Sequence, residues 1–118
     1  MSDKNQILKE RREAYLREIL SEIFSGLHDS RLNCLEIVAV SCSRGKHDAK
    51  IFVNKGDFTE LEQSEVLRAF KAARGLIKNE VLHISSWHSV PNFTLEFDSS
   101  LETQNRLDEI FKQIKATK

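Results

Sequence analysis

The chain has 118 residues, of which 40% are hydrophobic and 31% are charged, and its formal net charge at pH 7 is zero. This composition excludes an intrinsically disordered chain, and the length fits one domain whose core needs no metal or disulfide. The neutral total excludes a protein that coats nucleic acid by bulk charge, so any affinity for phosphates must come from a local cluster of cations.

The first half of the chain predicts a helix followed by a β-hairpin. Apolar residues recur at helical spacing over about residues 6–27. Residues 35–42 are nearly continuously apolar and rich in β-branched side chains, which indicates a buried strand. A polar turn over residues 43–48 separates it from an alternating strand over residues 49–53. The short connection contains Gly45, which favours an antiparallel hairpin.

The second half predicts a long helical region, a strand and a further helix. Residues 59–62, Thr-Glu-Leu-Glu, match a capping box, and helical periodicity continues to Val81. Gly75 lies in the middle of this region, and Gly in a helix costs about 1 kcal/mol relative to Ala. We therefore expect a break or kink there, which makes two helices. Residues 93–97 alternate strictly and predict a half-buried strand, and residues 100–116 predict a C-terminal helix.

The expected fold class is α+β, with the element order α-β-β-α-α-β-α. A three-stranded sheet would carry the helices on one face, because the last strand can return beside the hairpin by a crossover. An α-β-β-α-α-β order with a break between the middle helices is that of the type II K-homology (KH) fold. We expect a single KH-like RNA-binding domain over residues 1–118, with its core at about residues 6–98.

The middle helices carry a stripe of cations, which we call the basic stripe. Its members are Arg68, Lys71, Arg74 and Lys78. At 100° per residue they fall within an arc of about 120°, beside the apolar face. Residues 66–79 contain no acidic residue, so the cations lack the i,i+4 partners that solvated helix faces usually have. The stripe also spans Gly75, where backbone N–H groups could approach a phosphate. The simpler alternative is an ordinary solvated face.

Other residues give weaker indications of RNA binding. Arg44 and Lys46 in the hairpin turn, and Lys50 on the second strand, add cations, although a hydrophilic turn is the simpler interpretation. Trp87 and His88 precede the last strand, where an aromatic ring could stack on an unpaired base. For Trp87 we favour the alternative that it closes the core.

Patterns for catalysis or metal binding are absent from the sequence. The four histidines have no metal-type spacing, and no phosphate-binding loop or nucleophile elbow occurs. If Cys34 and Cys42 lie on one strand, roughly 26 Å separates them, too far for a disulfide. Reduced thiols, no export signal and no apolar run of about 18 residues predict a cytoplasmic protein. We expect no enzyme activity, no cofactor and no membrane partner.

Several short segments resemble motifs of a known family. The matching segments are residues 28–32, 41–44, 49–53, 73–75 and 90–100. They are similar, in order, to an Asp-Pro-Arg-Leu turn, the two sides of a hairpin, an Ala-x-Gly kink, and a Val-Pro-x-Leu-x-Phe-x-x-Asp-x-Ser segment. Through these motifs the chain, from about Ile7 to Asp98, resembles bacterial ribosome-binding factor A.

The resemblance implies a type II KH fold and a factor that binds the small (30S) ribosomal subunit during its assembly. It also implies help with processing of the 16S ribosomal RNA and with growth in the cold, and no cofactor or catalytic residue. The chain departs from the family at Ser30, where Pro is usual, and at Ser86 and His88, where Arg is frequent. Its neutral charge predicts weaker RNA affinity or a larger share of contacts with ribosomal proteins.

The leading hypothesis is thus a monomeric ribosome assembly factor that grips ribosomal RNA through the basic stripe and Gly75. Weaker candidates for the same contact are Arg31, Arg44, Lys46 and Lys50. A second hypothesis is a protein-interaction module that uses the first helix or a sheet edge, with the basic stripe incidental. A third, an enzyme with an unfamiliar site, has no support in the sequence.

Overall fold

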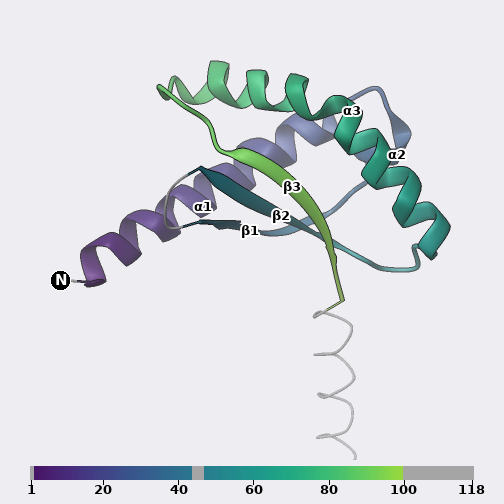
Figure 1. Cartoon of the computed structure of the whole chain (residues 1–118), viewed down its shortest axis with the longest axis horizontal. Coiled ribbons are helices and arrows are strands. Elements are labelled where there is room, and N and C mark those ends of the chain that lie inside the picture. Colours follow the sequence, from purple (N-terminus) through teal and green to yellow (C-terminus); the bar gives the residue numbers. More distant parts are fainter. Residues whose placement is uncertain (1, 44–46, 100–118) are drawn as a thin grey trace, which may run out of the picture.

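The structure is a computed structural model that describes residues 2–43 and 47–99. Its elements in chain order are α1 (Ser2–Ser25), α2 (Ser30–Asn33), β1 (Ile37–Cys42), β2 (Asp48–Asn54), α3 (Glu60–Ser85) and β3 (Asn92–Asp98). The strands form one sheet, with α1 and α3 packed against it (Figure 1). The mixed α+β class is therefore confirmed.

The sheet has three strands in the order β1-β2-β3. β1 pairs antiparallel with β2, so the predicted hairpin is confirmed. β3 pairs parallel with β2, with Ala49 opposite Phe93 and Ile51 opposite Leu95. A parallel neighbour requires a crossover connection, which α3 supplies. The return of the last strand beside the hairpin is as the sequence predicted.

One face of the sheet forms the core with α1 and α3. α1 contributes Leu16, Leu20 and Phe24 at spacings of four residues, and these side chains are at most 1% exposed. Ile77 on α3 and Phe93 on β3 are fully buried in the same cluster. Burying one such side chain stabilises the fold by about 1.5–3 kcal/mol, so this cluster fixes both helices against the sheet.

The start of α3 follows the predicted capping box. The hydroxyl oxygen of Thr59 accepts a hydrogen bond from the Glu62 backbone N–H over 3.1 Å, and the Glu62 carboxylate accepts one from the Thr59 N–H over 3.0 Å. These bonds satisfy two backbone donors that the first turn of a helix otherwise leaves unpaired. The sequence thus identified this helix boundary from local chemistry.

The expected division of α3 into two helices at Gly75 is wrong. Residues 60–85 form one helix, whose axis bends in Figure 1 without interruption. The penalty for one Gly is about 1 kcal/mol, whereas Phe70 and Ile77, on either side of Gly75, each gain more than that by burial. Packing therefore outweighs the local cost. The described order also includes the short α2, which the sequence did not predict.

Some predictions lie outside the described residues: the hairpin turn with Arg44 and Lys46, and the C-terminal helix over residues 100–116. Among the described residues, no helix combines the length and the apolar composition that a membrane span requires.

Candidate nucleic-acid interface

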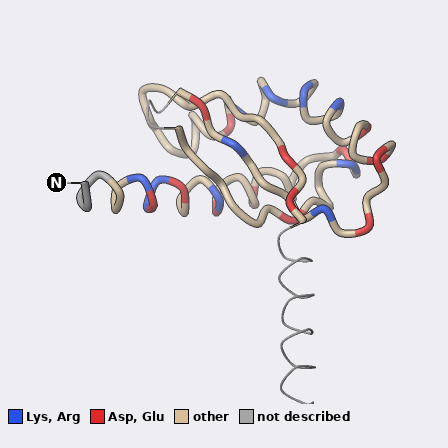
Figure 2. Tube along the Cα trace, turned by 60° about the horizontal axis from the view of Figure 1, so that its bottom comes forward, with Lys and Arg blue, Asp and Glu red and all other residues tan. Residues whose placement is uncertain are grey.

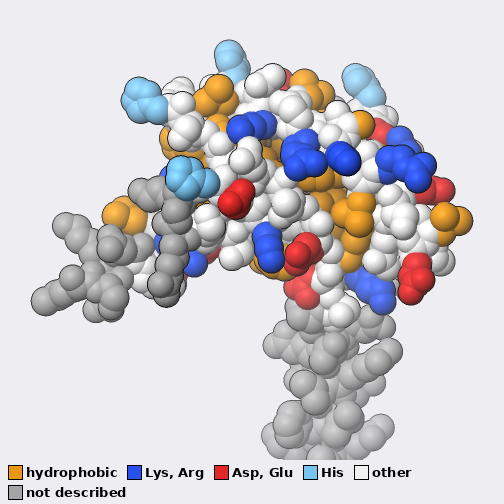
Figure 3. All heavy atoms as spheres, in the orientation of Figure 1, with side chains coloured by type: hydrophobic (Ala, Val, Ile, Leu, Met, Phe, Trp, Pro, Cys, Tyr) orange, Lys and Arg blue, Asp and Glu red, His pale blue; other side chains and the backbone are white. Residues whose placement is uncertain are grey.

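α3 displays its cations along one side. All the Lys and Arg residues of this helix are members of the basic stripe. Arg68 and Lys71 are exposed, and Arg74 and Lys78 are half-buried. Figure 3 shows them as a row of blue side chains over α3, and Figure 2 shows the same row along the trace. Helical spacing of three and four residues thus produces a continuous line of positive charge.

The cations of the basic stripe keep their charge uncompensated by carboxylates. In residues 2–43 and 47–99, ion pairs join Lys9 to Glu13, Arg31 to Asp29 and Lys50 to Glu96, and none includes a member of the stripe. Lys78 Nζ donates a hydrogen bond to Asn92 Oδ1 over 2.8 Å, and this partner is a neutral amide. The stripe is therefore free to neutralise the phosphates of a bound polyanion.

The basic stripe lies beside the sheet surface that the helices leave uncovered. Asn92 opens β3, so its contact with Lys78 joins the stripe to that strand. Thr94 and Glu96 on β3 and Lys50 on β2 are exposed and alternate with the buried residues of their strands. Figure 3 shows cations over α3 and mixed charges below them, on the same side of the molecule. A ligand on the stripe would thus meet the sheet next.

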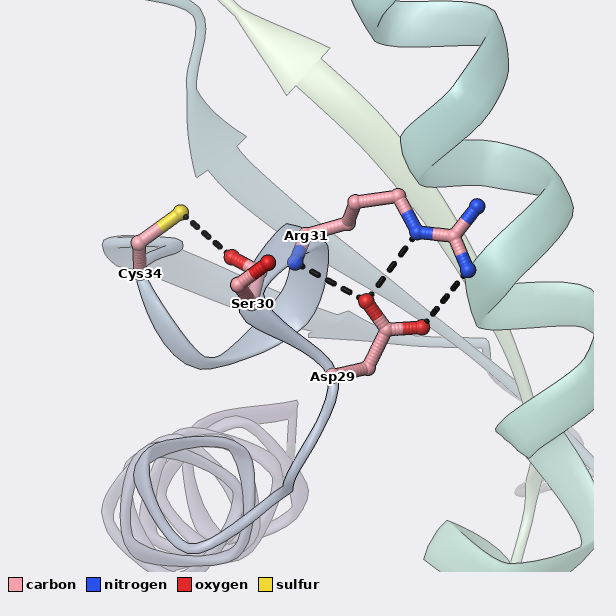
Figure 4. A network of polar contacts seen from close by, with 4 residues as sticks. All are labelled: Asp29, Ser30, Arg31 and Cys34. Carbon is pink, nitrogen blue, oxygen red and sulfur yellow. Dashed lines mark hydrogen bonds and ion pairs between the residues drawn. The ribbon is translucent and has the colours of Figure 1, made fainter.

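Arg31 forms an ion pair within its own turn, with the carboxylate of Asp29. Its guanidinium donates to both carboxylate oxygens of Asp29, over 3.0 and 2.8 Å, while its backbone N–H donates to the same carboxylate (Figure 4). These hydrogen bonds lower the pKa of Asp29. The sequence proposed Arg31 as a cation for RNA, but in the fold Asp29 caps α2 and its carboxylate compensates the charge of Arg31.

Lys50 is also paired. Its Nζ lies 3.5 Å from Glu96 Oε1, across the parallel pairing of β2 and β3. The pair is solvent-exposed, so it contributes less than about 1 kcal/mol, yet it removes the net charge at that point. Arg31 and Lys50 are therefore weaker candidates than the members of the basic stripe.

Trp87 lies against the core, as the packing interpretation predicted. It is half-buried, and its ring centroid is 5.6 Å from that of Tyr15. The Arg12 guanidinium carbon lies 4.5 Å from the centroid of the Trp87 ring, a cation–π contact. Arg12 thus occupies a face of the ring that a base would need. The sequence pattern gives no signal for this contact, because Arg12 and Trp87 are far apart in the chain.

Little in the described part of the chain suggests other chemistry. No three His, Cys, Asp or Glu side chains there are grouped so that they could hold a metal ion. Burial raises the pKa of the Cys42 thiol, and the nearby Glu13 carboxylate adds to this effect. A raised pKa leaves less of the reactive thiolate at neutral pH. His88 is exposed on the surface of the described residues.

Comparison with known proteins gives a consistent result. The family model described as Ribosome-binding factor A matches residues 9–111. A ribosome-binding factor A of Wolinella succinogenes is 40% identical over 115 residues, which cover 98% of this chain and 96% of that protein. One from Helicobacter pylori strain HPAG1 is 44% identical over 106 residues, or 90% of each chain.

Solved structures show the same fold. The crystal structure of ribosome-binding factor A from Thermus thermophilus superposes with a TM-score of 0.66 at 24% identity, covering 75% of this chain and 93% of that one. A second structure, a homology model of the Thermus thermophilus factor fitted into a cryo-EM map of its complex with 30S, has a TM-score of 0.57 at 26% identity. It covers 73% of this chain and 88% of the other.

Proposed function

The chain belongs to the ribosome-binding factor A family, and from this premise we propose that it binds the small (30S) ribosomal subunit through the basic stripe. The observation that carries the proposal is the row of four α3 cations, none of which is paired with a carboxylate of the described residues. The Thermus thermophilus relative fitted into a 30S complex supports the choice of partner.

Ribosomal RNA is the chemical target that suits the basic stripe. Arg68 and Lys78 are ten residues apart, so the stripe extends about 15 Å along the helix. That length is enough to contact several successive phosphates of one strand. Arg binds phosphate with a planar fork of donors, and Lys supplies a mobile point charge, so a stripe of both can follow an irregular backbone.

Finer features of the proposal follow from the family resemblance. The protein would act as a cytoplasmic assembly factor that assists late maturation of the small subunit and processing of its 16S rRNA. Its fold would be a variant of the type II KH domain in which one long α3 replaces the two middle helices. It would act by binding, with no catalytic residue and no cofactor, and as a monomer in a single domain.

Charge reversal tests the site. In the variant R68E/K71E/R74E we expect co-sedimentation with purified 30S subunits to be lost and the thermal midpoint to stay nearly unchanged, because none of the three side chains belongs to the buried core or pairs with a carboxylate of the described residues. Undiminished co-sedimentation would exclude the basic stripe as the contact.

A matched pair of double variants separates local contact from total charge. R68E/K71E and R11E/R17E change the net charge equally, and Arg11 and Arg17 are exposed on α1 without an ion pair among the described residues. We expect only R68E/K71E to weaken binding strongly. Equal losses would show that total charge, rather than the stripe, controls affinity.

One observation favours the alternative of a protein-interaction module. The N-terminal part of α1 extends beyond the sheet in Figures 1 and 2, and it exposes 49% of Ile7 and 57% of Leu8. A protein partner on this helix would bind with weak salt dependence, and the complex would survive ribonuclease. The same co-sedimentation assay, repeated with I7D/L8D, distinguishes the two functions.

A further inference from the structure

A groove of about 710 Å³ lies between α3, the C-terminal end of α1 and α2. Its apolar lining consists mainly of Ile23, Leu27, Leu32, Ala72, Leu76 and Ile84. Leu76 is 55% exposed and Ile84 is 45% exposed, although each borders this hollow. Apolar surface left in water is unfavourable by about 25 cal/mol per Å², so a contiguous apolar groove favours an occupant.

The groove and the basic stripe occupy different flanks of α3. At 100° per residue, the groove positions of α3, such as Ala72, Leu76 and Glu80, centre roughly opposite the stripe. An occupant of the groove would therefore leave the stripe open. The inference is independent of the proposed function, since neither surface requires the other.

The rim of the groove is acidic. Glu22 and Glu80 line it, are exposed, and form no ion pair within the described residues. The third carboxylate, Asp29, is neutralised by Arg31. An occupant with apolar side chains flanked by cations would satisfy both the lining and the rim.

We propose that the occupant is the chain's own C-terminal segment, residues 100–118. In this segment Ile110, Phe111 and Ile114 have the spacing of one helical face. Residues 110–118 also contain three lysines and no Asp or Glu. The last nine residues of the segment thus combine the apolar face that the lining requires with the positive charge that complements Glu22 and Glu80, whereas its acidic residues, Glu102, Asp108 and Glu109, precede them.

The connection is long enough for the segment to reach the groove. The Asp98 carbonyl accepts a hydrogen bond from the Lys55 N–H over 3.1 Å, so β3 ends beside the loop that leads into α3. The groove begins at Ala69, nine residues into the helix, or about 14 Å along its axis. The twelve residues from Asp98 to Ile110 can span up to about 40 Å when extended. The twelve-residue connection is therefore long enough to bring Ile110 to the groove.

Paramagnetic relaxation enhancement in the full-length chain tests the proposal. A nitroxide is attached at A116C in a C34S background, in which the remaining Cys42 is buried and poorly reactive. We expect strong broadening of the amide signals of Leu76, Glu80 and Ile84, and little at Ile7, which lies sixteen residues (about 24 Å) along α1 from Ile23. Absence of selective broadening at the groove would overturn the proposal.

Matched variants and a mixed sample complete the test. F111D should abolish the broadening, whereas Q113D, which adds the same charge on another face, should preserve it. L76D, at an exposed groove position, should abolish it without unfolding the chain. Broadening that occurs only between a spin-labelled chain and a separate ¹⁵N-labelled chain would overturn the proposal in favour of docking between two copies.

Discussion

Lys78 on α3 donates a hydrogen bond from Nζ to Oδ1 of Asn92, the first residue of β3, over 2.8 Å. This contact fixes the C-terminal member of the basic stripe beside the sheet. Because the acceptor is a neutral amide, Lys78 keeps its positive charge. The stripe is thus partly ordered in position yet electrostatically intact, which suits an anion-binding surface.

The neutrality of this acceptor leads to a prediction. N92D would convert the hydrogen bond into an ion pair and cancel the charge of Lys78, so 30S binding should weaken, by about tenfold or less for one contact. N92A removes the acceptor and leaves the charge, so it should bind like the unmodified protein. Filter binding or co-sedimentation of both variants measures the difference, and equal affinities would show that Lys78 contributes nothing.

Salt dependence counts the phosphates contacted. If the four cations of the basic stripe each neutralise one phosphate, the logarithm of affinity should fall against the logarithm of salt concentration with a slope near −2.8, at about −0.7 per contact for single strands. R74M should reduce the slope by about 0.7, whereas R31M, which removes a cation already paired with Asp29, should not. A flat salt response would argue for the protein-interaction alternative.

The continuity of α3 at Gly75 predicts a stabilising substitution. Gly75 is exposed within the helix, and a Cβ atom added there meets no atom within 4 Å. G75A should therefore stabilise the fold by about 0.5–1 kcal/mol and raise the thermal midpoint by about 2–6 °C. Gly56, with φ of +49°, is the control, since G56A should destabilise. Destabilisation by G75A would indicate that Gly75 acts as a hinge.

The bond between Asp29 and Arg31 predicts a pH dependence. Hydrogen bonds from Arg31 hold the pKa of Asp29 below its usual value, so the folded state favours the carboxylate. Their stabilising contribution is present above about pH 3.9 and is lost as pH falls through the lowered pKa. In D29N, which retains a capping side chain, the thermal midpoint should depend less on pH over this range. Parallel pH dependences would contradict the effect.

The two cysteines should differ in reactivity. Cys34 is exposed, whereas Cys42 is buried and its pKa is raised, chiefly by burial. Under native conditions at about pH 8, iodoacetamide should modify Cys34 at least about tenfold faster than Cys42, because the thiolate is the reactive form. Mass spectrometry of the intact protein should show one adduct in buffer and two in denaturant. Two adducts formed together in buffer would indicate that β1 opens readily.

The sequence by itself determined the elements whose signals are local. The alternation of residues 93–97 predicts β3, the capping chemistry of Thr59 and Glu62 predicts the start of α3, and spacing alone predicts that its cations share one side. Each signal depends on residues a few positions apart, whose relation is fixed by the geometry of a strand or a helix.

Tertiary structure decided what depends on residues far apart in the chain. The parallel register of β2 and β3 brings Glu96 to Lys50 and cancels its charge, and the packing of α1 brings Arg12 onto Trp87. Burial of Phe70 and Ile77 keeps α3 continuous through Gly75 against its local preference. Such outcomes depend on the sum of many packing contacts between distant residues. The sequence could therefore identify candidate phosphate-binding cations but could not show which of them pair with carboxylates.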